Sequence, residues 1–318
     1  MSIKSVPLIK QSPPRLAHHD YTVGWICALP QEQAAATVML DELHENLANP
    51  IGDHNTYTLG SIGSHNVVSW WVSAAALLPK FDWVTLSWAP PSGQWPGLVQ
   101  WDFGKTESEG FKRIGALNNP PAPLLTALSN LEARHQVEGS RIRHHLDVVE
   151  SKGKKLALRF TRRDHLHDPL DASILTFLGF LLGRWAYTPP RANGQGAKIE
   201  SLEEPKVHYG LIASGNQVIK DARYRDSLNT SLGGEILCIE MEAAGVANNF
   251  PCLAIHGICD YADEGKNKDW QEYAAGVAAA FTKELLVVQP IELNRERSVK
   301  DVLDQGSIST LFKGFRHV

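Results

Sequence analysis

Cysteine and methionine are scarce in this chain of 318 residues, and no cysteine pair has the spacing of a metal or redox motif. The four cysteines, Cys27, Cys238, Cys252 and Cys259, lie in short apolar runs without a C-x-x-C arrangement. We therefore expect buried, reduced thiols and a reducing compartment, which is the cytoplasm or the nucleus.

Long hydrophobic runs and an excess of charge of one sign are also missing. The longest apolar run, residues 174–187, is too short to span a bilayer and contains an arginine. The first 20 residues hold no apolar core of the length that a secretory signal needs. The net charge of −4 argues against general affinity for nucleic acid. We expect a globular protein without a membrane anchor.

Strands alternate with helices wherever the chain has clear periodicity. The apolar runs predict strands at 21–29, 206–214, 235–240 and 251–263. Helical spacing predicts helices at 31–47, 121–136 and 269–288, and two glycines mark a hairpin at 55–68. The last helix should begin with a capping box between Asp269 and Glu272. This alternation predicts the α/β class, with a largely parallel sheet flanked by helices.

Acidic and hydroxyl side chains lie at or just past the expected strand ends. These residues are Glu32, Ser214, Glu240, Glu242 and Asp260. Ligands of parallel sheets bind at the carboxyl ends of the strands. Buried carboxylates are costly unless something pairs with them. The sequence therefore predicts that these side chains line one binding site.

Four stretches resemble the superfamily of purine nucleoside phosphorylases, uridine phosphorylases and methylthioadenosine/adenosylhomocysteine nucleosidases. They are "YTVGWICALPQEQAA", "NTYTLGSIGSHNVV", "GLVQWDFGKT" and nearly all of 206–290, including "CIEMEAAG" and "GICDYAD", about two-thirds of the chain. The resemblance is strongest to the N-terminal domains of fungal NACHT- or ankyrin-type receptor proteins. It implies a three-layer fold with a central mixed sheet at 20–290, between a disordered lead-in at 1–19 and a tail at 291–318.

The resemblance also implies cleavage of the N-glycosidic bond of a purine-type nucleoside. In the family's pattern, Met241 packs on the ribose and Glu242 accepts hydrogen bonds from its hydroxyls, which strengthen as positive charge develops. Asp260 is then the general acid toward the leaving base, a role that requires a raised pKa. The backbone near Val218 and Ile219 lines the base, and Ser214 and Glu240 complete the substrate-binding set.

Glu32 separates hydrolysis from phosphorolysis in this pattern. Family nucleosidases carry a glutamate at the end of the first strand that activates water, and "ALPQEQAA" has Glu32 but no arginine to hold phosphate. A bare carboxylate repels phosphate, so hydrolysis is favoured, with phosphate as the alternative co-substrate. No cofactor is implied, and family members are usually homo-oligomers. Taken singly, Glu32, Glu242 and Asp260 also fit plain helix-start or loop positions, so the interpretation depends on their joint occurrence.

Three other patterns do not meet the requirements of known sites. Residues 97–106 end like a phosphate-binding loop, but Val99 stands where that motif needs glycine. The histidines at 165–167 and at 144–145 lack acidic or cysteine partners at ligand spacing, so no metal site is expected. The basic stretch 151–163 is typical of a solvated face rather than a nucleic-acid surface.

Residues 69–97 hold five of the nine tryptophans and lack clean periodicity. The family has here a glycine-rich loop and a strand, whose glycines let backbone N–H groups approach the ligand. Back-translation of residues 70–89, read after dropping two nucleotides, permits V-G-I-G-G-G-V-A-A-E-I-R-L-G-D-V-V-V-G-T. The pattern indicates that 70–89 is a wrong-frame translation of this loop and strand.

The fold should therefore be incomplete around 69–91. A family segment on the order of thirty residues, a strand and a helix, is also missing after Val68, and residues 172–190 are a second departure. A sheet that loses an internal strand leaves unpaired backbone groups. We expect impaired cleavage from the chain as written. The alternatives are a non-catalytic ligand-sensing module of a receptor-type protein and a defective product.

Overall fold

The computed structural model describes residues 16–49, 51–71, 83–86, 97–161, 166, 204–250, 252–265 and 268–289. The first fifteen residues of the expected lead-in, the departure at 172–190 and the tail at 291–318 lie outside these ranges, and so do the histidines at 165 and 167. The expected boundaries of the domain at 20 and 290 therefore stay predictions.

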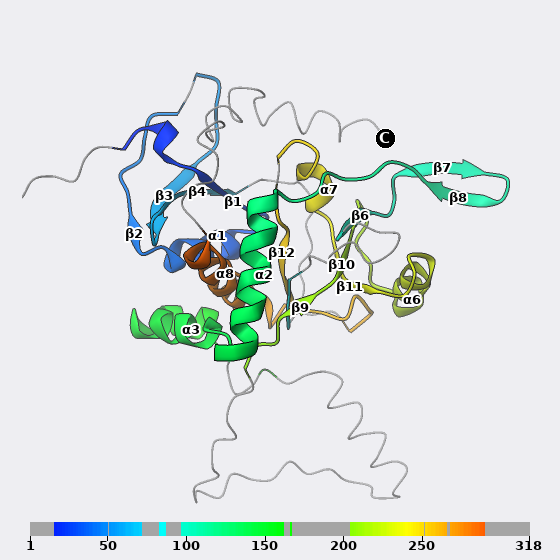
Figure 1. Cartoon of the computed structure of the whole chain (residues 1–318). Coiled ribbons are helices and arrows are strands. Elements are labelled where there is room, and N and C mark those ends of the chain that lie inside the picture. The colour runs from blue at the N-terminus through cyan, green and yellow to red at the C-terminus, as the bar shows by residue number, and fades with distance from the viewer. Residues whose placement is uncertain are drawn as a thin grey trace, which may run out of the picture.

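The first sheet forms around a hairpin near the N-terminus (Figure 1). Its order is β1 (Val23–Cys27), β4 (His65–Trp71), β3 (Tyr57–Ile62) and β2 (Glu42–Leu43). β1 and β4 are parallel, while β3 and β4 form the antiparallel hairpin predicted at 55–68. Gly63 adopts a φ of 56° in its turn, a conformation that glycine reaches without strain.

The helix predicted at 31–47 is shorter than expected and ends as α1 (Pro30–Met39). Tertiary contacts end it. Leu40 is buried against Ile62 and Val67 of the hairpin. The carboxylate of Asp41 accepts hydrogen bonds from the Gly63 N–H at 2.8 Å and from Lys283 Nζ at 2.6 Å. The chain after Leu40 is therefore held in an extended form, and β2 pairs with β3.

The second sheet supplies most of the strand ends of interest. β10 (Leu211–Ser214) lies between β11 (Ile236–Glu240) and β6 (Leu98–Gln100), and both neighbours run parallel to it. Parallel pairing aligns the carboxyl ends of these strands at one edge. The predicted strand at 235–240 is confirmed within one residue.

A third sheet contains a strand from the tryptophan-rich segment. β5 (Trp83–Leu86) pairs antiparallel with β12 (Ile255–Ile258) and parallel with β9 (His208–Tyr209). β5 falls where the shifted reading frame places its strand, so this part of the chain is extended in the structure as well. β12 is shorter than the strand predicted at 251–263.

The predicted strand at 206–214 divides at Gly210 into β9 and β10, which belong to different sheets. A side chain has no room at the division, because a Cβ on Gly210 would lie 2.2 Å from Leu237 Cδ1. Glycine lets the backbone pass against β11 as it changes partners.

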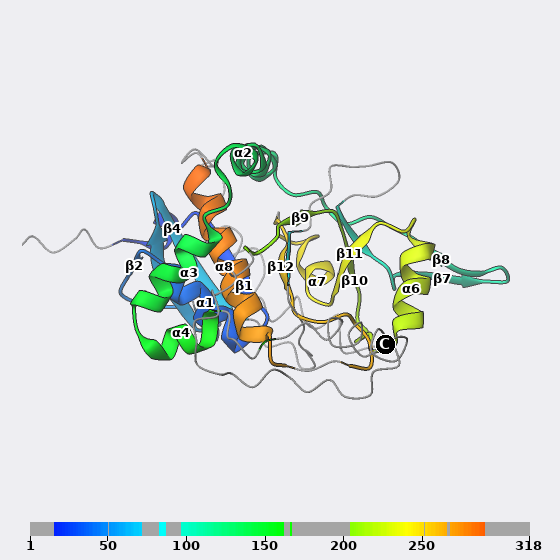
Figure 2. The ribbon, with the colours of Figure 1, turned by 90° about the horizontal axis from the view of Figure 1, so that it is seen from below.

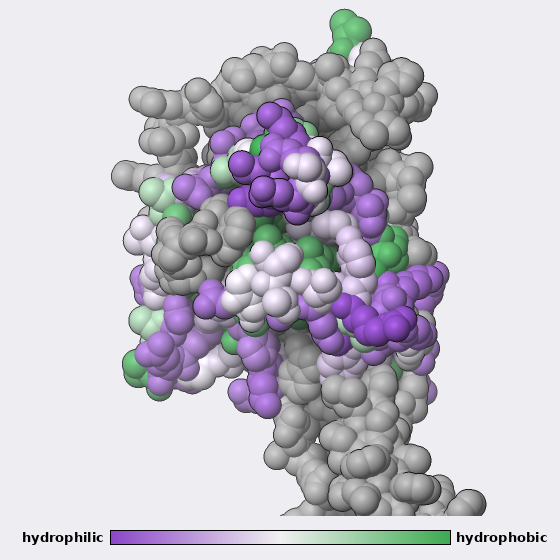
Figure 3. Space-filling view, turned by 90° about the vertical axis from the view of Figure 1, so that its right-hand side faces the viewer, coloured by the Kyte–Doolittle hydropathy of each residue, from purple (hydrophilic) through white to green (hydrophobic). Residues whose placement is uncertain are grey.

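A β-hairpin projects from this half of the molecule (Figures 1 and 2). It consists of β7 (Gly104–Glu107) and β8 (Gly110–Arg113). Phe103 and Phe111 are each 54% exposed on it. Hydrophilic residues nevertheless cover most of the described part of this face (Figure 3).

The helices pack mainly around α8 (Gln271–Val288), which runs through the larger half of the molecule (Figure 2). Around it lie α1, α2 (Ala122–Glu138), α3 (Ile142–Ser151) and α4 (Lys154–Phe160). The helical spacing that predicted a helix at 269–288 is confirmed, because one face of α8 and its N-cap is buried: Trp270, Tyr273, Ala274, Val277, Phe281 and Leu285. α2 confirms the helix predicted at 121–136.

The capping box predicted at the start of α8 is wrong. The helix begins one residue later than expected, so Trp270 is its N-cap and no side chain caps that position. Glu272 instead accepts a hydrogen bond from Arg159 Nε at 2.7 Å, which ties α4 to α8. An ion pair with a neighbouring helix has replaced the local contact.

The predicted α/β class is confirmed, with parallel strands in three sheets and helices packed around them. The described strands lie in four separate sheets rather than in one central sheet. Across the described ranges, no helix is both long enough and apolar enough to cross a bilayer. All four cysteines are free thiols, and Cys27, Cys238 and Cys259 are buried as expected.

Candidate functional site

The end of β10 lies directly beside the end of β11. The register of the two strands pairs Ser214 with Glu240. Ser214 is fully buried, and its Oγ accepts a hydrogen bond from the N–H of Ala244 at 2.9 Å. Glu240 is 6% exposed, and its Oε2 accepts hydrogen bonds from the N–H groups of Glu242 and Ala243, both at 2.8 Å. These contacts hold the turn that follows the strand around the buried carboxylate.

The helix that follows this strand has only one turn, α7 (Ala243–Val246). Met241 and Glu242 therefore lie in the turn itself, where both are half-buried. The carboxylate of Glu242 accepts a hydrogen bond from the N–H of Met241 at 3.1 Å. The two glutamates thus bind backbone groups of the same tight turn.

Glu240 and Glu242 form a close carboxyl pair. Burial, and then the negative charge of Glu240, raise the pKa of Glu242 well above its ordinary value. The Oε1 atom of Glu240 is buried and accepts no hydrogen bond from the described residues. Burial and the neighbouring charge of Glu240 therefore both favour the protonated form of Glu242.

Two further acids act electrostatically on this part of the molecule, Glu32 on Glu242 and Asp260 on the thiol of Cys238. Glu32 contributes to the raised pKa of Glu242. The buried thiol of Cys238 has a raised pKa, first because of burial and then because of Glu240, Glu242 and Asp260. The structure therefore gathers the four acidic residues predicted from the sequence, which we call the strand-end cluster: Glu32, Glu240, Glu242 and Asp260.

Glu32 also has a local structural role. It lies in the first turn of α1, where its Oε2 accepts hydrogen bonds from the N–H groups of Ala28 at 2.8 Å and Leu29 at 3.1 Å. These two donors directly precede the first turn of α1, so Glu32 helps to cap the start of its own helix. Oε2 of Glu32 is therefore engaged with the backbone, and Oε1 is the second oxygen of the carboxylate.

Asp260 follows β12 in a strained turn. Asp260 is buried, and its Oδ1 accepts a hydrogen bond from the N–H of Ala262 at 2.6 Å. Ala262 has a φ of 50°, which is uncommon for a residue other than glycine. Arg225 of α6 (Ala222–Ser231) donates a hydrogen bond from Nη1 to the carbonyl of Tyr261. A helix on the far side of the site therefore supports the turn that carries Asp260.

The loop after β10 is fixed by the end of β6. Asp102 Oδ2 accepts hydrogen bonds from the backbone N–H of Asn216 at 2.6 Å and from its Nδ2 at 3.0 Å. A Cβ on Gly215 would lie 2.3 Å from Trp101 Nε1, so only glycine fits over the indole. These two contacts set the course of the backbone toward Val218.

Ile219 and Val218 have different surroundings in this loop. The side chain of Ile219 is buried in an apolar cluster with Trp101 and Leu228, and Ala262 packs against the same cluster. Val218 is half-buried. The loop and the turn after Asp260 are therefore neighbours. Because the side chain of Ile219 is buried, only its backbone could make the predicted contact with a base.

His256 is a site residue that the sequence analysis missed. One ring nitrogen of His256 and one carboxylate oxygen from each of Glu240 and Glu242 lie within 4.8 Å of one another. The position of His256 indicated that it could share a face with Asp260. Alternate residues of a strand share a face, and His256 lies an even number of positions before Asp260. The sequence analysis considered only histidines that are adjacent in sequence.

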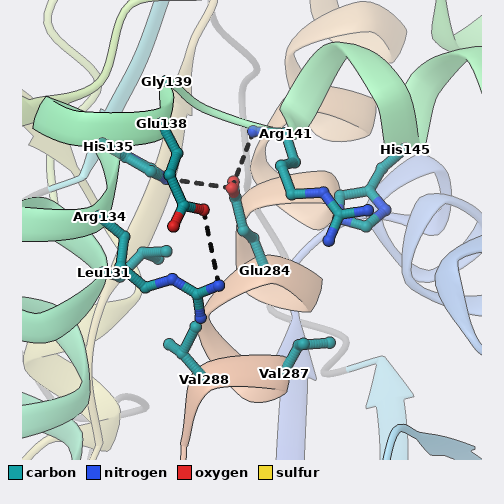
Figure 4. A pocket seen from close by; sticks show the side chains of 10 residues that line it. All are labelled: Leu131, Arg134, His135, Glu138, Gly139, Arg141, His145, Glu284, Val287 and Val288. Atoms are coloured by element: carbon teal, nitrogen blue, oxygen red, sulfur yellow. Dashed lines mark hydrogen bonds and ion pairs between the residues drawn. The ribbon is translucent and has the colours of Figure 1, made fainter.

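A small cavity lies elsewhere, where the corner between α2 and α3 meets α8 (Figure 4). Its volume is about 60 Å³, and no residue of the predicted site lines it. Nucleoside-sized pockets measure hundreds of cubic ångströms. The cavity is therefore too small for a nucleoside, and the strand ends remain the candidate site.

Glu284 is the central residue of this helix corner (Figure 4). It is buried, accepts a hydrogen bond from the Arg141 N–H at 2.8 Å and pairs with His135 Nε2 at 3.1 Å. Despite burial, the bonds from His135 and Arg141 hold the pKa of Glu284 below its ordinary value. We call His135, Arg141 and Glu284 the helix-corner cluster.

Comparison with known proteins identifies relatives of two kinds. The chain is 38% identical over 328 aligned positions to a nucleotide-binding leucine-rich repeat (NLR)-like protein of Hyaloscypha variabilis, covering 90% of this chain. The chain spans only 31% of that protein's length. It is also 25% identical to a 5'-methylthioadenosine/S-adenosylhomocysteine nucleosidase of Mycobacterium bovis, covering 85% of this chain and 97% of that protein. No family model matches the chain.

Among solved structures, the chain is similar to the native futalosine hydrolase of Helicobacter pylori. The identity is 14%, 85% of this chain and 99% of that chain are covered, and the TM-score is 0.49. The sequence relatives confirm the resemblance to nucleosidases and to receptor-type proteins that the motifs indicated.

Proposed function

With its similarity to the nucleoside phosphorylase and nucleosidase superfamily confirmed, we propose that this fold cleaves the N-glycosidic bond of a purine nucleoside at the strand-end cluster. The observation that carries the proposal is the convergence of residues from four separate strand ends. Ser214 pairs in register with Glu240, Glu32 acts electrostatically on Glu242, and Asp260 acts with both glutamates on Cys238, which supports one shared site. The similarity to a nucleosidase over 85% of the chain supports the same chemistry.

The Glu240–Glu242 pair is suited to bind the ribose. A carboxyl pair that shares one proton can both accept from and donate to neighbouring sugar hydroxyls. Negative charge beside the sugar also stabilises the oxocarbenium-like transition state, in which the ring becomes positive. Met241 lies between the two glutamates and supplies an apolar surface for the sugar.

Asp260 is placed to act on the base. As the bond between the sugar carbon and the base nitrogen breaks, its electron pair leaves with the base, and a proton from Asp260 neutralises the base. The loop that Asp102 fixes brings the backbone near Val218 beside this turn. Burial of Asp260 supports its role, because a buried carboxyl retains its proton more readily.

Glu32 is the proposed base for an attacking water. The water oxygen bonds to the sugar carbon, and its proton passes to Oε1 of Glu32, since Oε2 is held by Ala28 and Leu29. The other three carboxyl groups of the cluster make the site unfavourable for phosphate. We therefore favour hydrolysis over phosphorolysis.

Replacement of the glycine-rich loop at 70–89 limits the chain as written. The test compares this chain with a frame-restored form, in which residues 70–89 are VGIGGGVAAEIRLGDVVVGT. Release of free base from methylthioadenosine, adenosine and inosine is measured for both, with and without phosphate. We expect hydrolysis by the frame-restored form that exceeds that of the printed chain at least tenfold and does not need phosphate.

The Asp260→Asn variant of the frame-restored form is the control. Loss of a positioned proton donor lowers rates by about 10²–10⁴-fold. Equal turnover by the variant and its parent would contradict the assignment of Asp260. A restored form that folds but releases no base from any of the three nucleosides would overturn the proposed activity.

A second function is favoured by the NLR-like relative, of which this chain matches 31%. The domain would then bind a nucleoside as a signal without turning it over. Calorimetry with methylthioadenosine and adenine distinguishes the two functions. Saturable binding with no base released over hours supports the sensor, whereas turnover supports the enzyme.

A further inference from the structure

We propose that Glu240, Glu242 and His256 form a binding site for a divalent transition-metal ion, and that Zn²⁺ is the ion that fits it best. The inference concerns metal binding alone and does not depend on nucleoside cleavage. It goes beyond the sequence analysis, which expected no metal, because β12 brings His256 to the glutamate pair only in the folded chain.

The geometry of the three side chains permits a shared ion. One donor atom of each lies within 4.8 Å of the other two. Zn²⁺ binds carboxylate oxygen and imidazole nitrogen at about 2.0–2.2 Å, so small side-chain rotations bring all three atoms into contact with one ion. Glu240 ends β11 and His256 lies within β12, so strand pairing restrains these two ligands, while Glu242 lies in the turn after β11.

A second observation points to a missing ligand. Glu240 is only 6% exposed, and its Oε1 has no hydrogen-bond donor within the described ranges. Its Oε2 is held by two backbone N–H groups, at 2.8 Å each, so the carboxylate cannot turn away to find one. A buried carboxylate oxygen in this state is costly unless a proton or a cation binds it.

The charges around the pair also favour a cation. Glu240 and Glu32 both add negative charge around Glu242. A divalent ion neutralises two carboxylates at once, whereas a single shared proton neutralises one. The backbone bonds to Glu240 resemble the supporting hydrogen bonds that orient carboxylate ligands in metal proteins.

The donor set favours Zn²⁺ over other common ions. Mg²⁺ and Ca²⁺ take six or more oxygen ligands, whereas this set supplies two carboxylates and an imidazole nitrogen. Zn²⁺ accepts four ligands of mixed oxygen and nitrogen type, so three side chains leave one open position. Imidazole is a ligand that suits Zn²⁺.

Metal and sugar would compete if both bind here. The ribose site in the proposed function uses the same two glutamates, so an ion bound between them excludes the sugar hydroxyls. Zn²⁺ would then inhibit base release. This consequence rests on the proposed function, whereas the binding itself is measured without any nucleoside.

The test is calorimetric titration of the whole chain with Zn²⁺. We expect one equivalent to bind, and we expect His256→Gln and Glu240→Gln each to weaken binding at least tenfold. His208→Gln is the matched control, because His208 lies on β9 of the same sheet and is exposed. Circular dichroism confirms that each variant is folded, and Glu242→Gln replaces any variant that is not.

Three results would overturn the proposal. The first is no binding, and the second is binding that all the variants retain, which indicates an adventitious ion only. The third is ligation by cysteine, since Cys252 lies in the electrostatic range of Glu240. Co²⁺ is the probe for that outcome, because thiolate ligands add an intense charge-transfer absorption that Cys252→Ser would abolish.

Discussion

The strand-end cluster and the helix-corner cluster both bury glutamates, but they treat the charge in opposite ways. Glu284 meets His135 and a backbone N–H, and its pKa falls below the ordinary value. Glu242 meets another glutamate, and its pKa rises well above it. Burial opposes ionisation in both places, so the neighbouring groups decide whether the pKa of the glutamate rises or falls.

The difference distinguishes a structural charge from a site that needs a ligand. At the helix corner the fold itself supplies the donors, and Glu284 fastens the loop between α2 and α3 to α8. At the strand ends the fold leaves Glu240 Oε1 without a donor among the described residues. Unsatisfied polar groups and perturbed pKa values are typical of functional sites.

The largest expected effect comes from replacing the carboxyl group of Glu242. In the frame-restored form, Glu242→Gln should lower kcat/KM for the preferred nucleoside by about 10²–10³-fold, because the amide cannot replace the hydrogen bonds of the carboxyl group to the ribose hydroxyls as charge develops on the ring. Base release measured under steady-state conditions checks this. A loss smaller than threefold would remove Glu242 from the sugar site.

Glu284→Gln should have the second-largest effect, and on stability rather than on rate. Breaking a buried ion pair costs about 3 kcal/mol in the free energy of unfolding. Urea denaturation measures that loss, and kcat per folded molecule should stay unchanged. A variant as stable as its parent would show that Glu284 does not fasten the corner.

The same glutamine substitution at the strand ends should raise stability. Glu242→Gln replaces a carboxyl group whose ionised form is disfavoured by burial and by Glu240, and removing such a strained group from a functional site is worth about 1 kcal/mol. Urea denaturation of the two glutamine variants side by side gives opposite signs if the comparison is right. Destabilisation in both would make the two clusters equivalent.

Acidification should weaken the helix corner in two stages. Burial, and then the charge of Lys283, lower the pKa of His145 to about 4, so the unfolded chain binds its proton first and stability falls from about pH 6.5 downward. The depressed pKa of Glu284 means that its contribution is present above its unfolded pKa and is lost as pH falls through the folded one. Both signs agree.

Denaturation midpoints between pH 7 and pH 3 measure this loss. The charged groups that act on His145 are Lys283, Glu284, His144 and Arg141, and His135 pairs with Glu284. His145→Gln should remove the decline between pH 6.5 and 4, and Glu284→Gln the decline below it. An unchanged profile in both variants would place the acid sensitivity elsewhere.

The smallest effect is expected at an exposed pair. Asp41 and Lys283 lie 2.6 Å apart, but the Asp41 side chain is 45% exposed. Exposed ion pairs contribute about 0.2–1 kcal/mol. Asp41→Asn should therefore change the free energy of unfolding by less than 1 kcal/mol in urea denaturation. A loss as large as that of Glu284→Gln would show that burial does not determine how much an ion pair stabilises this fold.

Much of the fold was predictable because it depends on local periodicity. The apolar face of α8, the hairpin at 55–68 and the strand before Glu240 are all set by nearest neighbours in the sequence. The end of α1 was not, because Leu40 and Asp41 are held by the hairpin and by α8. Tertiary contacts there override helix propensity.

The candidate site was predictable only as a set of strand ends. Parallel pairing places Ser214 and Glu240 side by side, which the order of strands implied. His256 was not assigned, because its spacing from Asp260 indicates a shared face of the strand but not that this face meets the glutamate pair. Glu284 looked like an ordinary polar position on a helix, since its partners lie on the loop before α3 and on α2.

Gly210 makes two sheets depend on each other. β9 and β10 are separated by this one residue, yet they pair with strands of different sheets. Neither sheet can release its share of this run without pulling on the other, so the two should open as one cooperative unit. Amide hydrogen exchange should then give one common opening free energy for β10, β11 and β12. A substitution that weakens the pairing of β5 would therefore also lower the stability of β10 and β11, at the other end of the site.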